Sequence, residues 1–151
     1  MSEVDDFLSV TMPRLVKADT ALHSGDAGLR SAMWSHNEPV TLFGAAATKT
    51  GWAEVQSVFD WLASSFTRCE SFDYEVIAAG ASGDLAYVAG IEHTTASVDG
   101  RAPVPYQLRV TTIFRREGGE WKVVHRHGDP VPGGETAGPG MGLFDQEAAD
   151  S

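Results

Sequence analysis

Cysteine and basic side chains are both scarce in this sequence. Cys69 is the only cysteine, so an internal disulfide and a Cys-x-x-Cys metal site are excluded, and a reducing compartment is expected. Lysine and arginine total 11 against 21 acidic residues, which gives a net charge of −10. Because phosphates attract basic surfaces, this charge argues against nucleic acid or an anionic membrane as the partner.

Long apolar runs are missing as well. No stretch approaches the roughly 18 apolar residues that a membrane-spanning helix needs. The acidic start MSEVDDFL lacks the basic region and apolar core of a signal peptide. We therefore expect a cytoplasmic protein. Its 151 residues suit a single domain.

Helical periodicity fills the first half of the chain. Apolar residues predict a helix over 3–24, which Pro13 either kinks or divides into a loose turn and a shorter helix. Thr50 is expected to cap a later helix. The other elements expected here are a short helix over 26–34, a strand over 40–43 and a helix over 51–66.

The pattern changes to period two after residue 70. It predicts four strands, at about 71–80, 84–97, 103–116 and 120–129. Residues 131–151 are rich in glycine and acidic side chains, so they are expected to form a disordered tail behind a domain of residues 1–130.

The turn at Gly118-Gly119 sets the register of the last hairpin. A two-residue turn places Glu117 opposite Glu120, and a three-residue loop would instead place Arg116 there. We prefer the two-residue turn because it gathers the apolar side chains on one face. Three further pairs follow from it: Phe114 with Val123, Thr112 with His125, and Val110 with His127.

A second hairpin is predicted at Asp99-Gly100. A two-residue turn there sets three pairs: Ile91 with Leu108, His93 with Tyr106, and Tyr87 with Thr112. This register leaves Glu92 and Arg109 on the outer face. A shift of one residue would bring both into the pocket, where they would be the best polar site in the chain.

Helices followed by a meander predict an α+β fold, in which three N-terminal helices pack on a strongly curved, mainly antiparallel sheet. Over about residues 5–130 the chain resembles the nuclear transport factor 2-like superfamily, which contains ketosteroid isomerases, SnoaL-like polyketide cyclases and scytalone dehydratase. This resemblance implies that the fold is a cone-shaped α+β barrel. The segments that carry the resemblance are ALHSGD, VTLFG, GDLAYVAG and RREGGEWKVVHRH. The last also resembles the closing hairpin of the association domain of calmodulin-dependent protein kinase II. The resemblance implies a conical pocket and a homodimer formed through the outer sheet face.

His127 and Asp129 are the candidate catalytic residues. They follow each other on one face of the last strand, about 6.6 Å apart. A histidine with a near-neutral pKa can move a proton next to a carbonyl group. The resemblance to SnoaL-like cyclases implies a similar role for an Asp/His pair. The alternative is that His125 and His127 are structural and Asp129 closes the strand.

The expected ligand is a small, partly apolar organic molecule. A His-x-His pair can also bind metal, but no third ligand follows at a specific spacing, so neither a metal nor a cofactor is expected. The function is either that of a cofactor-independent isomerase, dehydratase or cyclase, or that of a non-catalytic ligand-binding or association module. The residues expected to line the pocket are Tyr87, His93, Tyr106, Thr112, His125, Trp34, Phe43 and Trp61.

Overall fold

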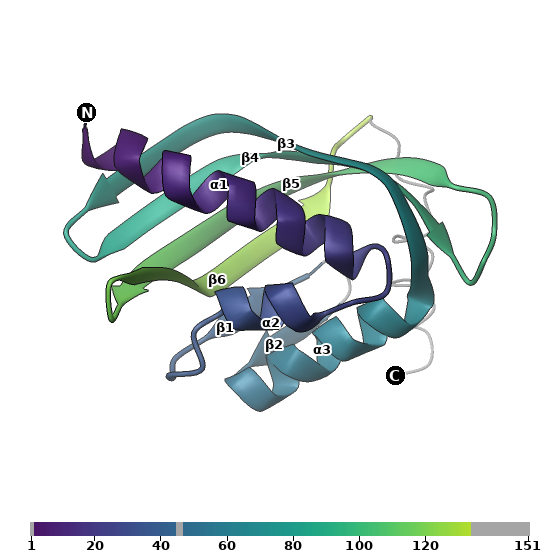
Figure 1. The fold of residues 1–151 in the computed structure, drawn as a ribbon, viewed down its shortest axis with the longest axis horizontal. Coiled ribbons are helices and arrows are strands. Elements are labelled where there is room, and N and C mark those ends of the chain that lie inside the picture. Colours follow the sequence, from purple (N-terminus) through teal and green to yellow (C-terminus); the bar gives the residue numbers. More distant parts are fainter. Residues whose placement is uncertain (1, 45–46, 134–151) are drawn as a thin grey trace.

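Three helices cover one face of a six-stranded sheet in the computed structural model, which describes residues 2–44 and 47–133 (Figure 1). The elements in chain order are α1 (Glu3–Leu22), α2 (Gly28–Met33), β1 (Thr41–Phe43), β2 (Thr48–Thr50), α3 (Trp52–Ser65), β3 (Phe66–Ser82), β4 (Leu85–Val98), β5 (Val104–Glu117) and β6 (Glu120–Pro130). The predicted α+β class and helices-first layout are confirmed. Of the tail expected over 131–151, the part from residue 134 on lies outside the described residues.

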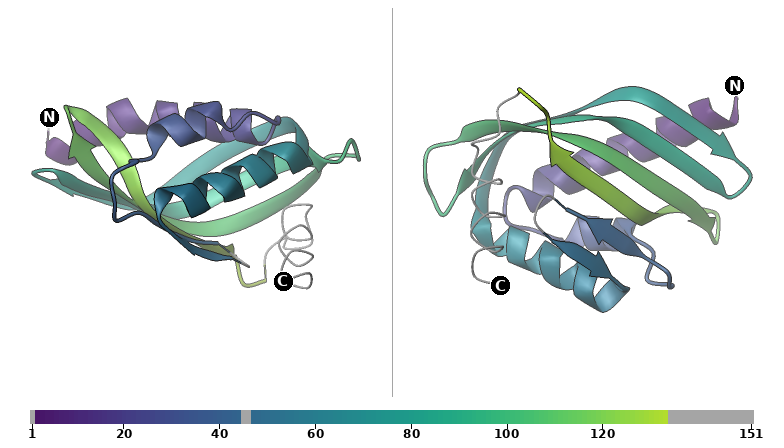
Figure 2. Two further views of the ribbon diagram at one scale, coloured as in Figure 1. Left: turned by 90° about the horizontal axis from the view of Figure 1, so that it is seen from below. Right: turned by 180° about the vertical axis from the view of Figure 1, so that it is seen from behind.

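The strand order is β2-β1-β6-β5-β4-β3. All neighbours are antiparallel except β1 and β6, which run parallel. The sheet curves around the helices but its two edge strands do not meet, so it is an open sheet (Figure 2). Three register shifts interrupt the pairing of β3 with β4, and such bulges bend a strand.

Helix α1 packs against the concave face of the long strands. Ser2 caps it by accepting a hydrogen bond from the backbone N–H of Asp5, and the helix continues through Pro13 without a break. Its buried face consists of Phe7, Thr11, Leu15, Ala18, Asp19 and Leu22, at helical spacing. A helix is therefore confirmed over most of the predicted range, and the alternative in which Pro13 begins a shorter helix after a loose turn is wrong.

The cap of α3 differs from the expectation. Thr50 lies in β2, and Gly51, with φ 88°, occupies the capping position without a side chain to cap with. The side chain of Glu38 takes over this role, because it accepts hydrogen bonds from the backbone N–H groups of Trp52 at 2.8 Å and Val40 at 3.2 Å. A capping residue 14 positions away in sequence leaves no local signal.

The last hairpin has the predicted turn. Gly118 and Gly119 have φ values of 56° and 81°, Glu117 pairs with Glu120, and Phe114 pairs with Val123. Beyond that point a bulge inserts one extra residue in β6. His125 therefore pairs with Ile113 and not with Thr112, which corrects the prediction.

The β4–β5 register also differs from the prediction, by one residue. Glu92 pairs with Leu108, and Thr94 pairs with Tyr106. The predicted two-residue turn itself forms, because Asp99 and Gly100 have φ values of 53° and 74° and the backbone N–H of Arg101 donates to Val98 O at 3.0 Å. The pairing resumes one residue out of step beyond the turn, where Ala96 pairs with Val104.

Both changes exchange the two faces of a strand, because side chains alternate along it. In β4, Glu92 and Thr94 point to the helices, and Tyr87, Ile91 and His93 point outward. In β6, past the bulge, Arg126 points inward, and His125 and His127 point outward. On β5 the residues predicted to point inward are buried, namely Tyr106, Leu108, Val110, Thr112 and Phe114.

Candidate ligand pocket and active site

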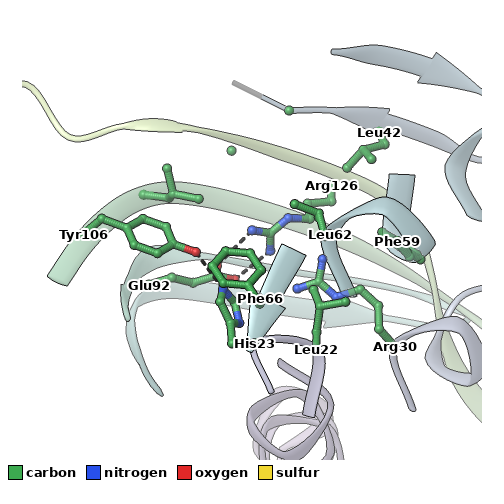
Figure 3. A pocket seen from close by; sticks show the side chains of 13 residues that line it. Leu22, His23, Arg30, Leu42, Phe59, Leu62, Phe66, Glu92, Tyr106 and Arg126 are labelled. Atoms are coloured by element: carbon green, nitrogen blue, oxygen red, sulfur yellow. Dashed lines mark hydrogen bonds and ion pairs between the residues drawn. The ribbon is translucent and has the colours of Figure 1, made fainter. Parts of the chain in front are cut away.

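A small cavity lies between the helices and the concave face of the sheet (Figure 3). Its volume is about 50 Å³, enough for a few water molecules. Apolar side chains from α1, α3, β1 and β5 form much of the wall, and five polar side chains are grouped within it. The lining residues are Leu22, His23, Arg30, Leu42, Gly44, Phe59, Leu62, Phe66, Glu92, Tyr106, Leu108, Arg126 and Gly128.

Glu92 of β4 and Arg126 of β6 form a two-pronged ion pair in the wall. Arg126 Nη1 and Nη2 donate to the two carboxylate oxygens of Glu92 at 2.6 and 2.8 Å. The side chains are only 3% and 12% exposed. Burial alone would raise the pKa of Glu92, but the charge and hydrogen bonds of Arg126 outweigh it and hold that pKa below its usual value. The pair is therefore ionised.

His23 and Tyr106 form the second polar group. His23 follows the last turn of α1, and its Nδ1 lies 2.7 Å from the carbonyl oxygen of Asp19. Since a carbonyl can only accept, Nδ1 carries the proton and Nε2 accepts the hydroxyl of Tyr106, 2.6 Å away. Figure 3 shows the Tyr106 hydroxyl directed at His23, beside Glu92 and Arg126.

Burial determines the ionisation of this second group. It lowers the pKa of His23 to about 4, an effect that Glu92 opposes and Arg126 reinforces. Burial also raises the pKa of Tyr106 above its usual value, with Glu92 adding to the effect. At neutral pH the pocket therefore presents a neutral imidazole as acceptor and a neutral phenol as donor.

Arg30 of α2 completes the polar set. It forms an ion pair with Asp19 of α1, and its guanidinium lies 5.2 Å from the ring centre of Phe59. Burial lowers the pKa of Arg30 to about 9, with a further contribution from Arg126. Two buried cations thus face two buried anions, Asp19 and Glu92. A site with balanced charge favours an uncharged ligand.

The matching family model covers residues 15–132 and describes a SnoaL-like domain. The chain belongs to the SnoaL-like domain family. No curated protein matches the sequence. The family assignment confirms the resemblance that the closing hairpin and the helix end ALHSGD indicated.

Solved structures share the fold of this SnoaL-like domain at low sequence identity. A ketosteroid isomerase-like protein from Erwinia carotovora has a TM-score of 0.67 at 17% identity, covering 84% of this chain and 98% of that one. A candidate dehydratase of the nuclear transport factor 2-like family from Streptomyces avermitilis has a TM-score of 0.65 at 18% identity, with 84% and 97% covered. A candidate calcium/calmodulin-dependent protein kinase type II association domain from Thiobacillus denitrificans has a TM-score of 0.66 at 19% identity, with 80% and 94% covered.

Only part of the predicted pocket is assembled. Tyr106 lines the cavity, and Trp34 and Thr112 line a smaller one beside it. Trp61 packs on the edge of the core, and Phe43 is 37% exposed. The inward placement predicted for Tyr87, His93 and His125 is wrong, because the register shift and the bulge turn them to the outer face.

The candidate catalytic residues His127 and Asp129 share one face of β6, but it is the outer face, and neither residue lines the cavity. His127 is exposed and lies beside Phe43, with 5.7 Å between the ring centres. Asp129 accepts two hydrogen bonds at 2.8 Å from Arg109, and these bonds are the main reason why the pKa of Asp129 is lowered. With the shifted register Glu92 lines the cavity, and Arg109 lies on the outer face.

Sequence reasoning missed His23, Arg30 and Arg126 in this SnoaL-like domain. Arg126 stands between two histidines that attracted the functional interpretation, and only the bulge reveals that it is the inward residue. His23 belongs to the helix end ALHSGD, so a signal existed, but it was used only for the fold. Arg30 lies in a six-residue helix whose buried residues are Arg30 and Met33, and an arginine adds nothing to an apolar pattern.

Two negative findings concern the described residues. Across residues 2–44 and 47–133, no three His, Cys, Asp or Glu side chains are grouped so that they could hold a metal ion. In the same part of the chain, no helix is long and apolar enough to cross a membrane.

Proposed function

We propose that this SnoaL-like domain binds a small, uncharged, partly apolar organic molecule in the cavity and transfers a proton on it without a cofactor, as an isomerase, dehydratase or cyclase does. The observation that carries the proposal is the 2.6 Å hydrogen bond from Tyr106 to the neutral His23, beside the buried Glu92–Arg126 pair. His23 and Tyr106, which line the cavity, take the proton-transfer roles that the sequence suggested for His127 and Asp129.

The chemistry follows from which atoms can donate. A guanidinium has five N–H donors, and Glu92 uses two of those on Arg126, so others remain for a ligand carbonyl oxygen. A ligand proton can pass to the oxygen of Tyr106 while Tyr106 passes its own proton to His23 Nε2. The carboxylate of Glu92 stabilises the imidazolium that results.

The experiment is a thermal-shift and turnover screen against three classes of small ketone, namely open-chain, cyclic and hydroxylated ketones, because the cavity of about 50 Å³ admits only a small ligand. Ligand binding raises the unfolding midpoint by mass action. We expect a shift with one class in the wild type and turnover that falls by about 10²–10⁴-fold in His23→Gln. Turnover unchanged in His23→Gln, or no midpoint shift from any class, would contradict the proposal.

A second candidate function is association through the outer sheet face, forming a homodimer. The observation that favours it is a group of exposed apolar side chains on β3 and β4: Ile77 at 65%, Leu85 at 58% and Tyr87 at 44%. A shallow groove beside them is lined by residues of β3, β4 and β5. Exposed apolar surface of this kind marks interaction sites.

Light scattering on the purified chain tests the association. We expect a dimer in the wild type and a monomer for Ile77→Lys combined with Tyr87→Glu, because both changes place charge on the apolar face. A wild type that is monomeric at high concentration would remove this candidate. The cavity proposal would stand, since none of the residues that line the cavity belongs to this group.

A further inference from the structure

A second, smaller cavity lies beside the first. Its volume is about 20 Å³, the size of one water molecule or one hydroxyl group. Arg30 and Arg126 line both cavities, so the two spaces touch the same two guanidinium side chains. The remaining lining residues are Leu15, Ala18, Asp19, Met33, Trp34, Thr112 and Val123.

Thr112 is the unusual member of this lining. Its side chain is on the inner face of β5, and the residue is 3% exposed. Within the described part of the chain its Oγ1 has no hydrogen-bond partner. An unpaired buried hydroxyl is costly, and native proteins nearly always satisfy such groups with protein or water. The unpaired hydroxyl of Thr112 therefore indicates that a polar molecule or group, called the guest below, is bound in the small cavity.

The surrounding groups define the chemistry of that guest. Arg30 and Arg126 can only donate hydrogen bonds, so the guest must accept. The carboxylate of Asp19, which is 3% exposed, can only accept, so a guest that meets it must donate. A carbonyl or ether oxygen meets the first demand alone. A hydroxyl oxygen meets both, and Thr112 can take either role towards it.

We propose that the small cavity is a binding site for one hydroxyl group, which Thr112 recognises: a water molecule in the free protein, and a hydroxyl of the ligand when the ligand reaches past Arg30 and Arg126. The ligand part of this inference rests on the proposed function of the larger cavity. It narrows the ligand class to molecules with two oxygen functions, a carbonyl oxygen at Arg126 in the larger cavity and a hydroxyl at Thr112 in the smaller one.

The first test needs no ligand. Thr112→Val keeps the shape of the side chain and removes its hydroxyl, and Thr112→Ser keeps the hydroxyl. If a water molecule is bound, we expect Thr112→Val to lower the thermal midpoint by a few degrees more than Thr112→Ser does. If the cavity is empty, Thr112→Val removes an unpaired polar group, so a midpoint equal to or above that of the wild type would overturn the proposal.

The second test separates water from ligand. Cyclohexanone and hydroxycyclohexanone serve as probes, with the affinity measured for wild type, Thr112→Val and Thr112→Ser. We expect the hydroxylated probe to bind about tenfold more weakly to Thr112→Val, which corresponds to one hydrogen bond, and cyclohexanone to bind all three alike. Equal loss for both probes would overturn the ligand part.

The two proposals fail differently. If neither probe binds wild type but Thr112→Val is the less stable variant, the hydroxyl site stands as a bound water and the proposed function loses its support. If both probes bind and Thr112 has no effect on affinity or midpoint, the larger cavity keeps its function and the hydroxyl site is refuted.

Discussion

Two ion pairs of nearly the same geometry lie on opposite faces of this sheet. Arg126 holds Glu92 at 2.6 and 2.8 Å on the inner face, and Arg109 holds Asp129 at 2.8 Å twice on the outer face. Their side chains are 12% and 3% exposed in the first pair, and 51% and 39% exposed in the second. The contacts are alike and the surroundings are not.

The difference in burial determines how much each ion pair contributes to stability and to the geometry of the cavity. Water can replace either partner of the outer pair, so the loss of a partner there is cheap. Inside, a charge that loses its partner stays buried and uncompensated. The inner pair therefore holds the polar side of the cavity in a fixed geometry for a ligand. The outer pair is an exposed surface contact that contributes little to stability.

The largest expected effect comes from breaking the inner pair at one end. Arg126→Met leaves Glu92 buried without its partner, so we expect a loss of about 3–5 kcal/mol in the free energy of unfolding. Urea denaturation at neutral pH measures it. Arg109→Met, on the neighbouring strand, is the matched control. Equal losses in the two variants would contradict the contrast between the faces.

Replacing both partners of the inner pair separates the cost of an unpaired buried charge from the contribution of the pair itself. Glu92→Leu combined with Arg126→Met removes both buried charges, and such apolar replacements are often neutral or stabilising. We expect this double variant to recover most of the stability lost by Arg126→Met in the same urea experiment while ligand binding stays lost. Recovery of binding together with stability would show that the ion pair has no functional role.

Acid should destabilise the fold through His23. Its folded pKa of about 4 lies below the ordinary 6.5, so between these values the unfolded chain binds a proton that the folded chain does not. The stability is fully present above pH 6.5 and falls as the pH is lowered to about 4, by roughly 3 kcal/mol. Urea midpoints against pH measure this loss.

His23→Gln removes the titrating group and should flatten that pH profile. Tyr106→Phe is the matched control, because it removes the partner hydroxyl and leaves the imidazole to titrate. Its profile should keep the slope of the wild type. A His23→Gln profile as steep as that of the wild type would show that other groups cause the acid sensitivity.

A smaller effect is expected for Tyr106→Phe at neutral pH. The variant loses the 2.6 Å hydrogen bond and leaves His23 Nε2 without its donor, so we expect a loss of about 1–3 kcal/mol. Urea denaturation measures the stability and the thermal-shift screen measures binding. The effect should lie between those of Arg126→Met and Arg109→Met.

The smallest effect is expected on the outer face. Arg109→Met should leave the urea midpoint unchanged within error, and any small change should disappear in high salt, because exposed charges are screened. A large, salt-independent loss would mean that the outer pair is covered in solution, as a dimer through this face would cover it.

The sequence predicted the fold class, the helices and the long hairpin because these depend on periodicity and turn glycines, which are local. The inner face of β5 was also predictable, since its apolar and polar residues alternate over 106–111. The errors lie where one extra residue changes the count: in the segment that follows the Asp99-Gly100 turn and in β6. One inserted residue leaves the alternation on either side intact, so the sequence pattern does not mark it.

The site follows from these errors. A one-residue change exchanges the faces of a strand, so Glu92 replaces His93 inside and Arg126 replaces His125 and His127. His23 follows the end of α1, and its partner Tyr106 lies on a strand far along the chain. Arg30 pairs with Asp19 of the preceding helix. Buried charge pairs of this kind are recognised only when both partners are placed, which a single sequence does not do.

Amide NMR shift mapping with cyclohexanone and hydroxycyclohexanone as probes tests the central claim most directly. The account predicts that the amides of His23, Glu92 and Tyr106 shift with probe concentration, that Tyr106→Phe weakens the response, and that His127→Ala leaves it intact. Shifts confined to residues 125–129 and abolished by His127→Ala, or no saturable shift with either probe, would contradict it.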